Sequence, residues 1–236
     1  MLQTFKILAT RKLDQFHLPN AAAKHIILVE EDFITTEPLI NEVVEKEIQK
    51  VVSKKINVIF TSINAVNAVA EQINQAPQWE VFTISDKTKK AVIQQFPKSK
   101  IIASASYGKD LVEKILSRKD ISDLVFFSGN KRMDTIPERL KSAGISLHEI
   151  IVYTTILSPK RIDDDYDGIL FFSPSAVESF FSINKIPKQT ILFSIGNTTT
   201  HALKAYSENK IITSDFQSVE QVINLANDYG FLNDLN

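Results

Sequence analysis

The sequence predicts an α/β protein built from two similar units, each a parallel β-sheet flanked by helices. Three observations lead to this class. Short, continuous apolar runs recur along the chain, which is typical of strands covered on both faces. Helical stretches separate most of these runs, which indicates βαβ units with right-handed crossovers. One strand–turn–helix motif also occurs twice, as "IFTSINAVNAV" at residues 59–69 and as "FFSPSAVESFF" at residues 171–181.

The predicted elements alternate along the whole chain. The strands are rich in apolar and β-branched residues and are predicted at 5–10, 25–30, 57–62, 80–85, 99–104, 123–128, 148–157, 168–173, 190–196 and 210–214. The helices repeat apolar residues at helical spacing and are predicted at 40–52, 64–75, 87–95, 109–118, 135–143, 175–183, 198–207 and 217–228. Strands that alternate with helices favour a parallel sheet.

The repeated motif belongs to a longer internal duplication. Phe60 and Phe171 lie 111 positions apart, and so do Ser62 and Ser173. The same offset carries "ISDKTKKAV" at 84–92 onto "IGNTTTHAL" in the second half of the chain. A fixed offset across two motifs predicts two similar α/β units of about 110–120 residues, an ordinary domain size.

The composition excludes several classes of function. The chain has 236 residues and a net charge of −1, which argues against nucleic-acid binding through a basic surface. It has no cysteine, which excludes disulfides and thiolate chemistry, and its four histidines lack the spacing of metal ligands. It contains no glycine-rich nucleotide-binding motif. Without an apolar run of ~20 residues or a signal-peptide block, a cytoplasmic protein with no membrane contact is expected.

Polar residues follow the predicted strands where helices begin. In open α/β sheets, ligands bind outside the carboxyl ends of the strands, and helix N-termini there attract anions. The hydroxyls and amides at these corners can bind carboxylates or phosphates, or each can simply cap its helix. Two such units facing each other would line a cleft for a large ligand with several anionic groups. The candidate residues are Thr61, Ser62, Asn64, Ser85, Ser128, Gly129, Ser173, Ser175, Gly196, Thr198 and Thr199.

Motifs along nearly the whole chain resemble those of the uroporphyrinogen-III synthase family, which closes the tetrapyrrole macrocycle without a cofactor. The similar segments are "ILATR" at 7–11, "IFTSINAVNAV" at 59–69, "FFSGNKRMDTIPERLKSAGISLHEIIVYTT" at 126–155, "ILFFSPSAVESFF" at 169–181 and "FSIGNTTTHALK" at 193–204. Their order and spacing carry the resemblance. The chain departs from the family's pattern at Asn197, where Pro is usual, and at Ser85 and Asp86, where Gly is more typical.

The resemblance implies flavodoxin-like domains that are interleaved. A plain repeat would place one boundary near residue 120, and the repeat alone leaves both arrangements open. In the family, one domain is built from both ends of the chain and the other is inserted between them. The expected division is 1–32 with 160–236 for the first domain and 38–152 for the second. Two extended linkers are expected at about 33–37 and 153–159.

The resemblance also implies a hydro-lyase of haem biosynthesis that acts on hydroxymethylbilane, a linear tetrapyrrole with eight carboxylates. Loss of the terminal hydroxyl gives an azafulvene, which the substituted carbon of ring D attacks to form a spiro intermediate. Fragmentation and reclosure then invert ring D and give the type III isomer. No cofactor and no metal are expected. The chain is expected to be a monomer, with transient contact to the enzyme that makes the bilane as a further partner.

Tyr153 is the catalytic candidate, because it matches the family's Tyr at the end of the "IIVY" strand. A phenol has a reference pKa of about 10, so it is protonated at neutral pH and can donate to the departing hydroxyl. The alternative is a tyrosine that only packs at a domain junction. Arg11 can pair with a substrate carboxylate or remain solvated.

Two other classes of protein stay open on the sequence. A non-enzymatic two-domain binding protein for a small polyanionic ligand would share this architecture, although the missing signal peptide counts against it. A regulatory receiver-type domain would need an acidic pair after its first strand. This chain has "ATRK" at residues 9–12 in that place.

Overall fold

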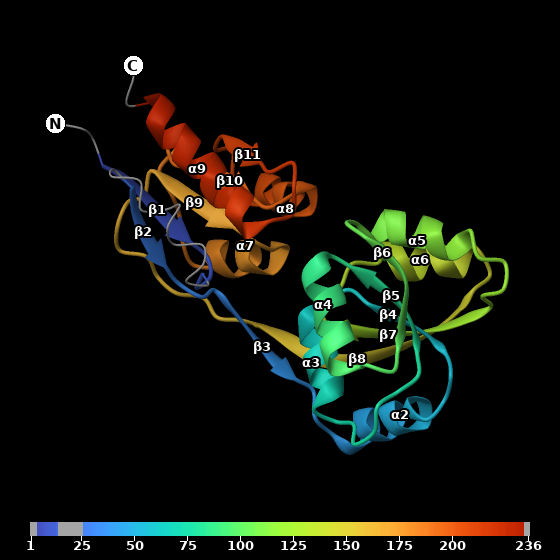
Figure 1. Ribbon diagram of the computed structural model, residues 1–236. Coiled ribbons are helices and arrows are strands. Elements are labelled where there is room, and N and C mark those ends of the chain that lie inside the picture. The colour runs from blue at the N-terminus through green and yellow to red at the C-terminus, as the bar shows by residue number, and fades with distance from the viewer. Residues whose placement is uncertain (1–3, 14–25, 234–236) are drawn as a thin grey trace. The chain divides into compact units, whose positions relative to one another are not determined.

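The computed structural model describes residues 4–13 and 26–233, and His17 and His25 lie outside this part of the chain. The chain divides into two compact units (Figure 1). The first comprises Met1–Thr35 with Ile156–Asn236, and the second comprises Thr36–Thr155. Each unit has a largely parallel sheet with helices on both faces, which confirms the predicted fold class.

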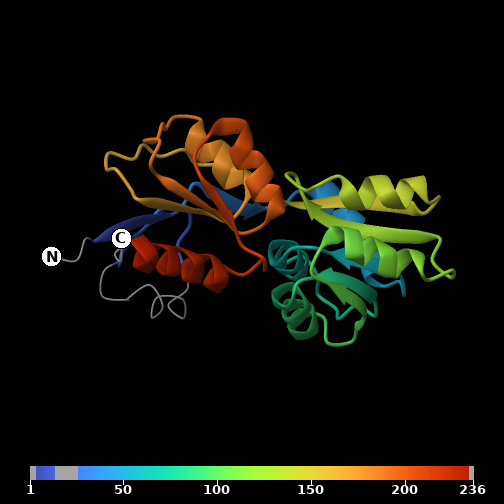
Figure 2. The same ribbon diagram turned by 90° about the horizontal axis from the view of Figure 1, so that it is seen from above.

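The first unit contains a five-stranded sheet in the order β11-β10-β9-β1-β2, in which neighbouring strands run parallel. Its strands are β1 (Phe5–Ala9), β2 (Ile26–Glu30), β9 (Gly168–Phe171), β10 (Ile191–Ser194) and β11 (Ile211–Thr213). Helices α7 (Pro174–Phe181) and α8 (Asn197–Tyr206) cover one face of this sheet, and α9 (Val219–Asn233) covers the other (Figure 2).

The two faces of this sheet have separate apolar cores. Ile7 and Phe193 pack with Val222 of α9 on one face. Leu8 and Leu192, their neighbours in sequence, pack with Phe180 of α7 on the other. Because successive side chains of a strand alternate between faces, a strand covered on both sides must be apolar throughout.

The second unit contains a six-stranded sheet in the order β3-β8-β7-β4-β5-β6. Its strands are β3 (Ile34–Pro38), β4 (Asn57–Phe60), β5 (Glu80–Ile84), β6 (Lys100–Ala105), β7 (Asp123–Gly129) and β8 (Ser146–Leu157). Helices α2 (Glu42–Val52), α3 (Ile63–Ala70) and α4 (Asp86–Gln95) cover one face, and α5 (Gly108–Leu116) and α6 (Thr135–Ser142) cover the other. No helix within the described ranges is long and apolar enough to cross a membrane.

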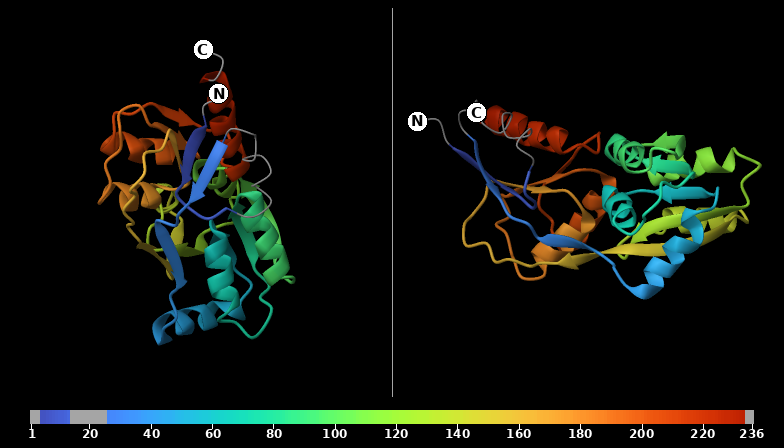
Figure 3. Two further views of the ribbon diagram at one scale, coloured as in Figure 1. Left: turned by 90° about the vertical axis from the view of Figure 1, so that its left-hand side faces the viewer. Right: turned by 60° about the horizontal axis from the view of Figure 1, so that its bottom comes forward.

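Strand β3 occupies the segment that the sequence predicted as an extended linker. It lies beside β8 at the edge of the sheet (Figure 3). The Leu39 amide donates to the Val152 carbonyl at 2.8 Å, and the Ser158 amide donates to the Phe33 carbonyl at 2.9 Å, which makes the pair antiparallel. Its sequence "ITTEP" is mostly exposed and ends in a proline, which only an edge strand tolerates.

The predicted duplication holds at the level of individual elements. Four successive elements of the second unit, β4, α3, β5 and α4, correspond to β9, α7, β10 and α8 of the first. Their starting residues are Asn57 and Gly168, Ile63 and Pro174, Glu80 and Ile191, and Asp86 and Asn197, and every pair is 111 positions apart. The order of these elements in the two sheets is also the same. The two halves therefore present equivalent strand–helix corners.

An aromatic cluster fills the core of the second unit between the sheet and α2–α4. Phe60, Trp79, Phe96 and Phe127 are all fully buried. The ring centroid of Phe60 lies 5.0 Å from that of Phe127 and 5.6 Å from that of Phe96. The indole N–H of Trp79 donates to the Val51 carbonyl at 3.1 Å, so its one polar atom is satisfied.

We expect Phe60→Ala to lower the free energy of unfolding by about 3–5 kcal/mol, because it removes a fully buried ring and leaves a cavity. Urea unfolding followed by the fluorescence of Trp79, the single tryptophan, measures this directly. Ile93→Ala on the exposed side of α4 is the control and should change stability by less than about 0.5 kcal/mol. Equal effects of both substitutions would contradict the packing described here.

Candidate functional site

Equivalent serine caps begin the helices that follow β4 and β9. The Oγ of Ser62 accepts the amide of Asn64 at 3.1 Å, and the Oγ of Ser173 accepts the amide of Ala176 at 3.1 Å. Both serines are half-buried and have extended backbone. A hydroxyl that accepts a capping bond keeps its own proton to donate. Capping and ligand binding are therefore compatible at these two corners, and the half-buried Thr61 and Ser175 lie beside them.

The corner after β5 has a strained backbone. Ser85 is exposed and has φ 65° and ψ 152°, a region that is nearly exclusive to glycine. It is also the position where the chain departs from the glycine typical of the resembling family. The Oγ of Ser85 accepts the amide of Thr88 at 3.3 Å, so the serine caps α4 despite its strain.

An open pocket of about 540 Å³ lies at this corner, beside the carboxyl ends of β5 and β6. Both signs of charge occur in its lining, which includes Ser85, Asp86, Lys89, Ser104, Ser106, Asp110 and Lys114. The ammonium group of Lys114 donates to the Ser104 carbonyl at 2.6 Å. Lys114 was not predicted, because nothing in its sequence context separates it from a solvated lysine on a helix.

Gly196 holds the position in the first unit that Ser85 holds in the second, 111 residues earlier. It precedes α8, and its carbonyl accepts the hydroxyl of Ser194 at 2.9 Å. Thr198 is half-buried, whereas Thr199 is 2% exposed and packs within the unit. Of these three predicted residues, only Thr199 has its side chain placed in the interior.

Arg11 follows β1, the strand beside β9. The neighbouring Thr10 is buried, and its hydroxyl donates to the Leu170 carbonyl at 2.8 Å. Arg11 is exposed, and its guanidinium carbon lies 6.0 Å from the ring centroid of Phe172. Because β10, β9 and β1 are adjacent and parallel, the corners at Gly196, Ser173 and Arg11 all lie at the carboxyl ends of the strands of the first sheet.

Tyr153 lies near the end of β8 and pairs in register with Gly129 at the end of β7. The register skips one residue of β8 between Ser128 and Gly129. The amide of Asn130 donates to the Tyr153 carbonyl at 3.2 Å, and its side-chain oxygen accepts the amide of Thr155 at 2.7 Å. Tyr153 is half-buried, and its hydroxyl has no hydrogen-bond partner among the residues that the structure describes.

Ser128 lies on β7 next to Gly129, but its side chain is enclosed. The residue is 2% exposed, and its Oγ has no hydrogen-bond partner within the described part of the chain. Gly129 is buried as well, so the corner after β7 exposes Asn130 rather than the serine hydroxyl. Asn130 was missed as a candidate, although it directly follows the predicted pair.

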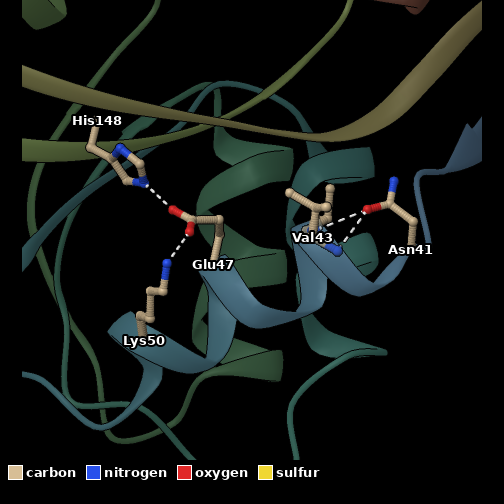
Figure 4. Close-up of polar contacts among 6 residues, drawn as sticks. Asn41, Val43, Glu47, Lys50 and His148 are labelled. Carbon is tan, nitrogen blue, oxygen red and sulfur yellow. Dashed lines mark hydrogen bonds and ion pairs between the residues drawn. The ribbon is translucent and has the colours of Figure 1, made fainter.

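Polar contacts outside the core hold β8 in place. Near its start, the Nε2 of His148 lies 2.8 Å from the carboxylate of Glu47 on α2, and Lys50 also binds that carboxylate (Figure 4). The side chain of Asn41 caps the same helix. Further along, Arg132 makes two bonds to Glu149, at 2.6 and 3.0 Å.

The Arg132 pair also fixes the loop after β7. The bond to Glu149 raises the pKa of Arg132, burial opposes this, and Asp134 adds a second ion pair. When a carboxylate binds a guanidinium through two hydrogen bonds, the pair fixes the orientation of the guanidinium in addition to the attraction between the charges. The loop that carries Asn130 is therefore tied to the strand that carries Tyr153.

Family comparison identifies the chain. Residues 22–224 match the family described as uroporphyrinogen-III synthase HemD. The chain belongs to the uroporphyrinogen-III synthase family. This confirms the resemblance inferred from the motifs, and the match runs through both units.

One relative of known sequence and two solved structures agree with this assignment. The uroporphyrinogen-III synthase of Saccharomyces cerevisiae is 31% identical over 115 residues, which cover 41% of this chain and 40% of that protein. A mutant uroporphyrinogen III synthase from Thermus thermophilus superposes with a TM-score of 0.68 at 12% identity and covers 98% of this chain and 100% of its own. Uroporphyrinogen-III synthetase from Helicobacter pylori gives a TM-score of 0.64 at 16% identity, with 96% and 100% covered. At these identities the two structures support the fold.

We expect Ser85→Gly to raise the free energy of unfolding by about 1 kcal/mol, because it relieves a strained φ and gives up little capping. Ser85→Ala should lower stability, since alanine keeps the strain and loses the capping oxygen. Urea unfolding of the three proteins tests this. A glycine variant as unstable as the alanine variant would contradict the backbone strain.

Stability should also depend on Glu47 at low pH. Its bond to Lys50 lowers the pKa of this carboxyl from 4.5, with His148 contributing in the same direction against the effect of burial. A carboxyl with a lowered pKa stabilises the fold above its unfolded pKa, and this contribution is lost as pH falls through the folded value. The stability difference between the wild type and Glu47→Gln should shrink as the pH falls from about 5.5 to below about 4.5. A difference that stays constant down to pH 3 would exclude this linkage.

Proposed function

We propose that this protein is a uroporphyrinogen-III synthase that cyclises hydroxymethylbilane with inversion of ring D. The observation that carries the proposal is the family match across residues 22–224. The strand-end corners support it, because they combine helix amides, hydroxyls and cations that suit a substrate with many carboxylates. The proposal includes a monomeric cytoplasmic enzyme that receives the bilane from the enzyme that makes it.

The proposed domains are 1–32 with 160–236 and 38–152, joined by linkers at about 33–37 and 153–159. Residues proposed to bind the substrate then fall into two sets. Arg11, Ser173, Ser175, Gly196, Thr198 and Thr199 belong to the first domain. Thr61, Ser62, Asn64, Ser85, Ser128 and Gly129 belong to the second. Their backbone amides contribute as much as their side chains, which suits the enclosed hydroxyls of Ser128 and Thr199.

In the proposed reaction, the terminal hydroxyl of the bilane takes a proton and leaves as water, and an azafulvene remains. The substituted carbon of ring D attacks the exposed methylene and forms the spiro intermediate. The bond from that carbon to its original bridge then breaks, and ring D recloses through its free carbon with loss of a proton. The electron-rich pyrrole expels hydroxide readily, so the main task of the protein is to hold the bilane in one conformation.

Tyr153 is the proposed proton donor to the departing hydroxyl. Two observations support this role. Its phenol has no partner among the described residues, and Asn130 binds both its carbonyl and the amide of Thr155. Ser62 and Ser173 are proposed to donate their remaining protons to substrate carboxylates.

We expect Tyr153→Phe to lower kcat about 10²-fold or more, the usual contribution of a general acid, with KM changed less than threefold. The measurement is the initial rate of hydroxymethylbilane consumption above the buffer rate. Tyr206→Phe removes a phenol hydroxyl from a tyrosine stacked on Phe181 outside the proposed site and should keep the wild-type rate.

The outcomes of this experiment separate the two claims. A wild-type rate equal to that of buffer would overturn the enzyme proposal and favour the polyanion-binding protein. Wild-type turnover that Tyr153→Phe leaves unchanged would overturn only the role of Tyr153.

A further inference from the structure

Gly129 lies directly against the tip of the Tyr153 ring. A Cβ built on Gly129 would lie 2.7 Å from the hydroxyl oxygen and 2.6 Å from Cε2 of Tyr153, and closer still to Cζ. Contacts under 3.0 Å do not occur at real Cβ atoms. The three atoms lie at the hydroxyl end of the ring. A side chain at position 129 would therefore displace the hydroxyl of Tyr153 rather than the part of the ring next to Cβ.

The requirement for glycine here is steric and not conformational. Among the described residues, Ser85 and Gly144 have φ in the left-handed region, and Gly129 is not one of them. An alanine could therefore adopt the backbone of Gly129, and the three atoms nearest to its methyl group would all belong to Tyr153. This distinguishes Gly129 from glycines that a turn demands.

The surrounding backbone is held in place, so relief of such a clash requires the ring of Tyr153 to rotate away from Gly129. The backbone amide of Asn130 donates to the Tyr153 carbonyl on β8, and the side-chain oxygen of Asn130 accepts the amide of Thr155 on the same strand. The skipped residue of β8 brings Tyr153 opposite Gly129, as irregular pairings often do near functional sites. Behind the ring, Tyr153 packs against the core that contains Phe127 and Val152.

We propose that Gly129 is a positioning residue that fixes the hydroxyl of Tyr153 for the cyclisation reaction. The tip of the phenol occupies the space that a side chain at Gly129 would fill, and Asn130 binds the carbonyl of Tyr153 and the amide of Thr155. The catalytic part of this inference rests on the proposed function. The structural part does not rest on it. This part states that a side chain at position 129 and the Tyr153 ring would occupy the same volume.

The structural part is tested by thermal unfolding of Gly129→Ala, Tyr153→Ala and the double variant. We expect Gly129→Ala to lower Tm by about 4 °C or more in the presence of Tyr153, and by less than about 1 °C in the Tyr153→Ala background. Should Gly129→Ala alone fail to fold, folding of the double variant supports the inference equally. Equal losses in both backgrounds would overturn it. Gly108→Ala is the control, because its Cβ would lie 3.4 Å from its nearest neighbour.

The catalytic part is tested by a double-mutant cycle with Tyr153→Phe. Gly129→Ala should lower kcat about tenfold or more with KM changed less than threefold, and it should lower kcat less than twofold further when Tyr153 is already Phe. A glycine that only supports the fold would lower kcat by the same factor in both backgrounds, and this result would overturn the positioning role. Absence of turnover in the wild type would instead overturn the proposed function and leave the result on Tm standing.

Discussion

Parallel pairing of the strands is the constraint on which the rest of the structure depends. In the first unit β1, β2, β9, β10 and β11 run in one direction, so the helix starts that follow them share one edge of the sheet. In the second unit β4 to β8 do the same. Parallel strands need crossover helices, which bury both faces of the sheet and confine polar chemistry to its ends.

The duplication gives two equivalent sets of strand–helix corners, and the residues at these corners differ in chemistry between the two units. Ser62 and Ser173 keep the same cap in both units. Ser85 and Gly196 are equivalent in position, but the serine holds a strained backbone beside a pocket with two lysines. Thr88 and Thr199 are also equivalent, and both are buried, which assigns both side chains to the packing of their units. A shared fold thus carries one corner lined by charges of both signs and one largely uncharged corner.

Much of the fold could be predicted because strands that are buried on both faces of a sheet have continuous apolar sequences. The helix starts were also predictable, since Ser62 and Ser173 are ordinary caps. For β3 the sequence predicts only extended backbone, because "ITTEP" is mostly exposed and owes its pairing to β8, more than 100 residues away. The interleaved division into domains was predicted from the family resemblance, because the internal repeat fits a tandem and an interleaved arrangement equally well.

The candidate site was less predictable, because its geometry depends on register. Residue type and strand ends suggested Ser128 as a ligand-binding hydroxyl, yet whether its side chain faces inward depends on the pairing of β7. The contact between Gly129 and Tyr153 depends on one skipped residue in β8, which no local pattern reveals. The tie between Arg132 and Glu149 joins two ordinary charged residues and likewise appears only in three dimensions.

The central claim is that this chain directs the cyclisation of hydroxymethylbilane to one isomer. The most direct measurement is the isomer composition of the product formed from freshly generated bilane, separated as type I and type III uroporphyrin after oxidation. The account predicts predominantly type III product with the protein and type I without it. Type I product alone, in the presence of folded protein, would contradict the account.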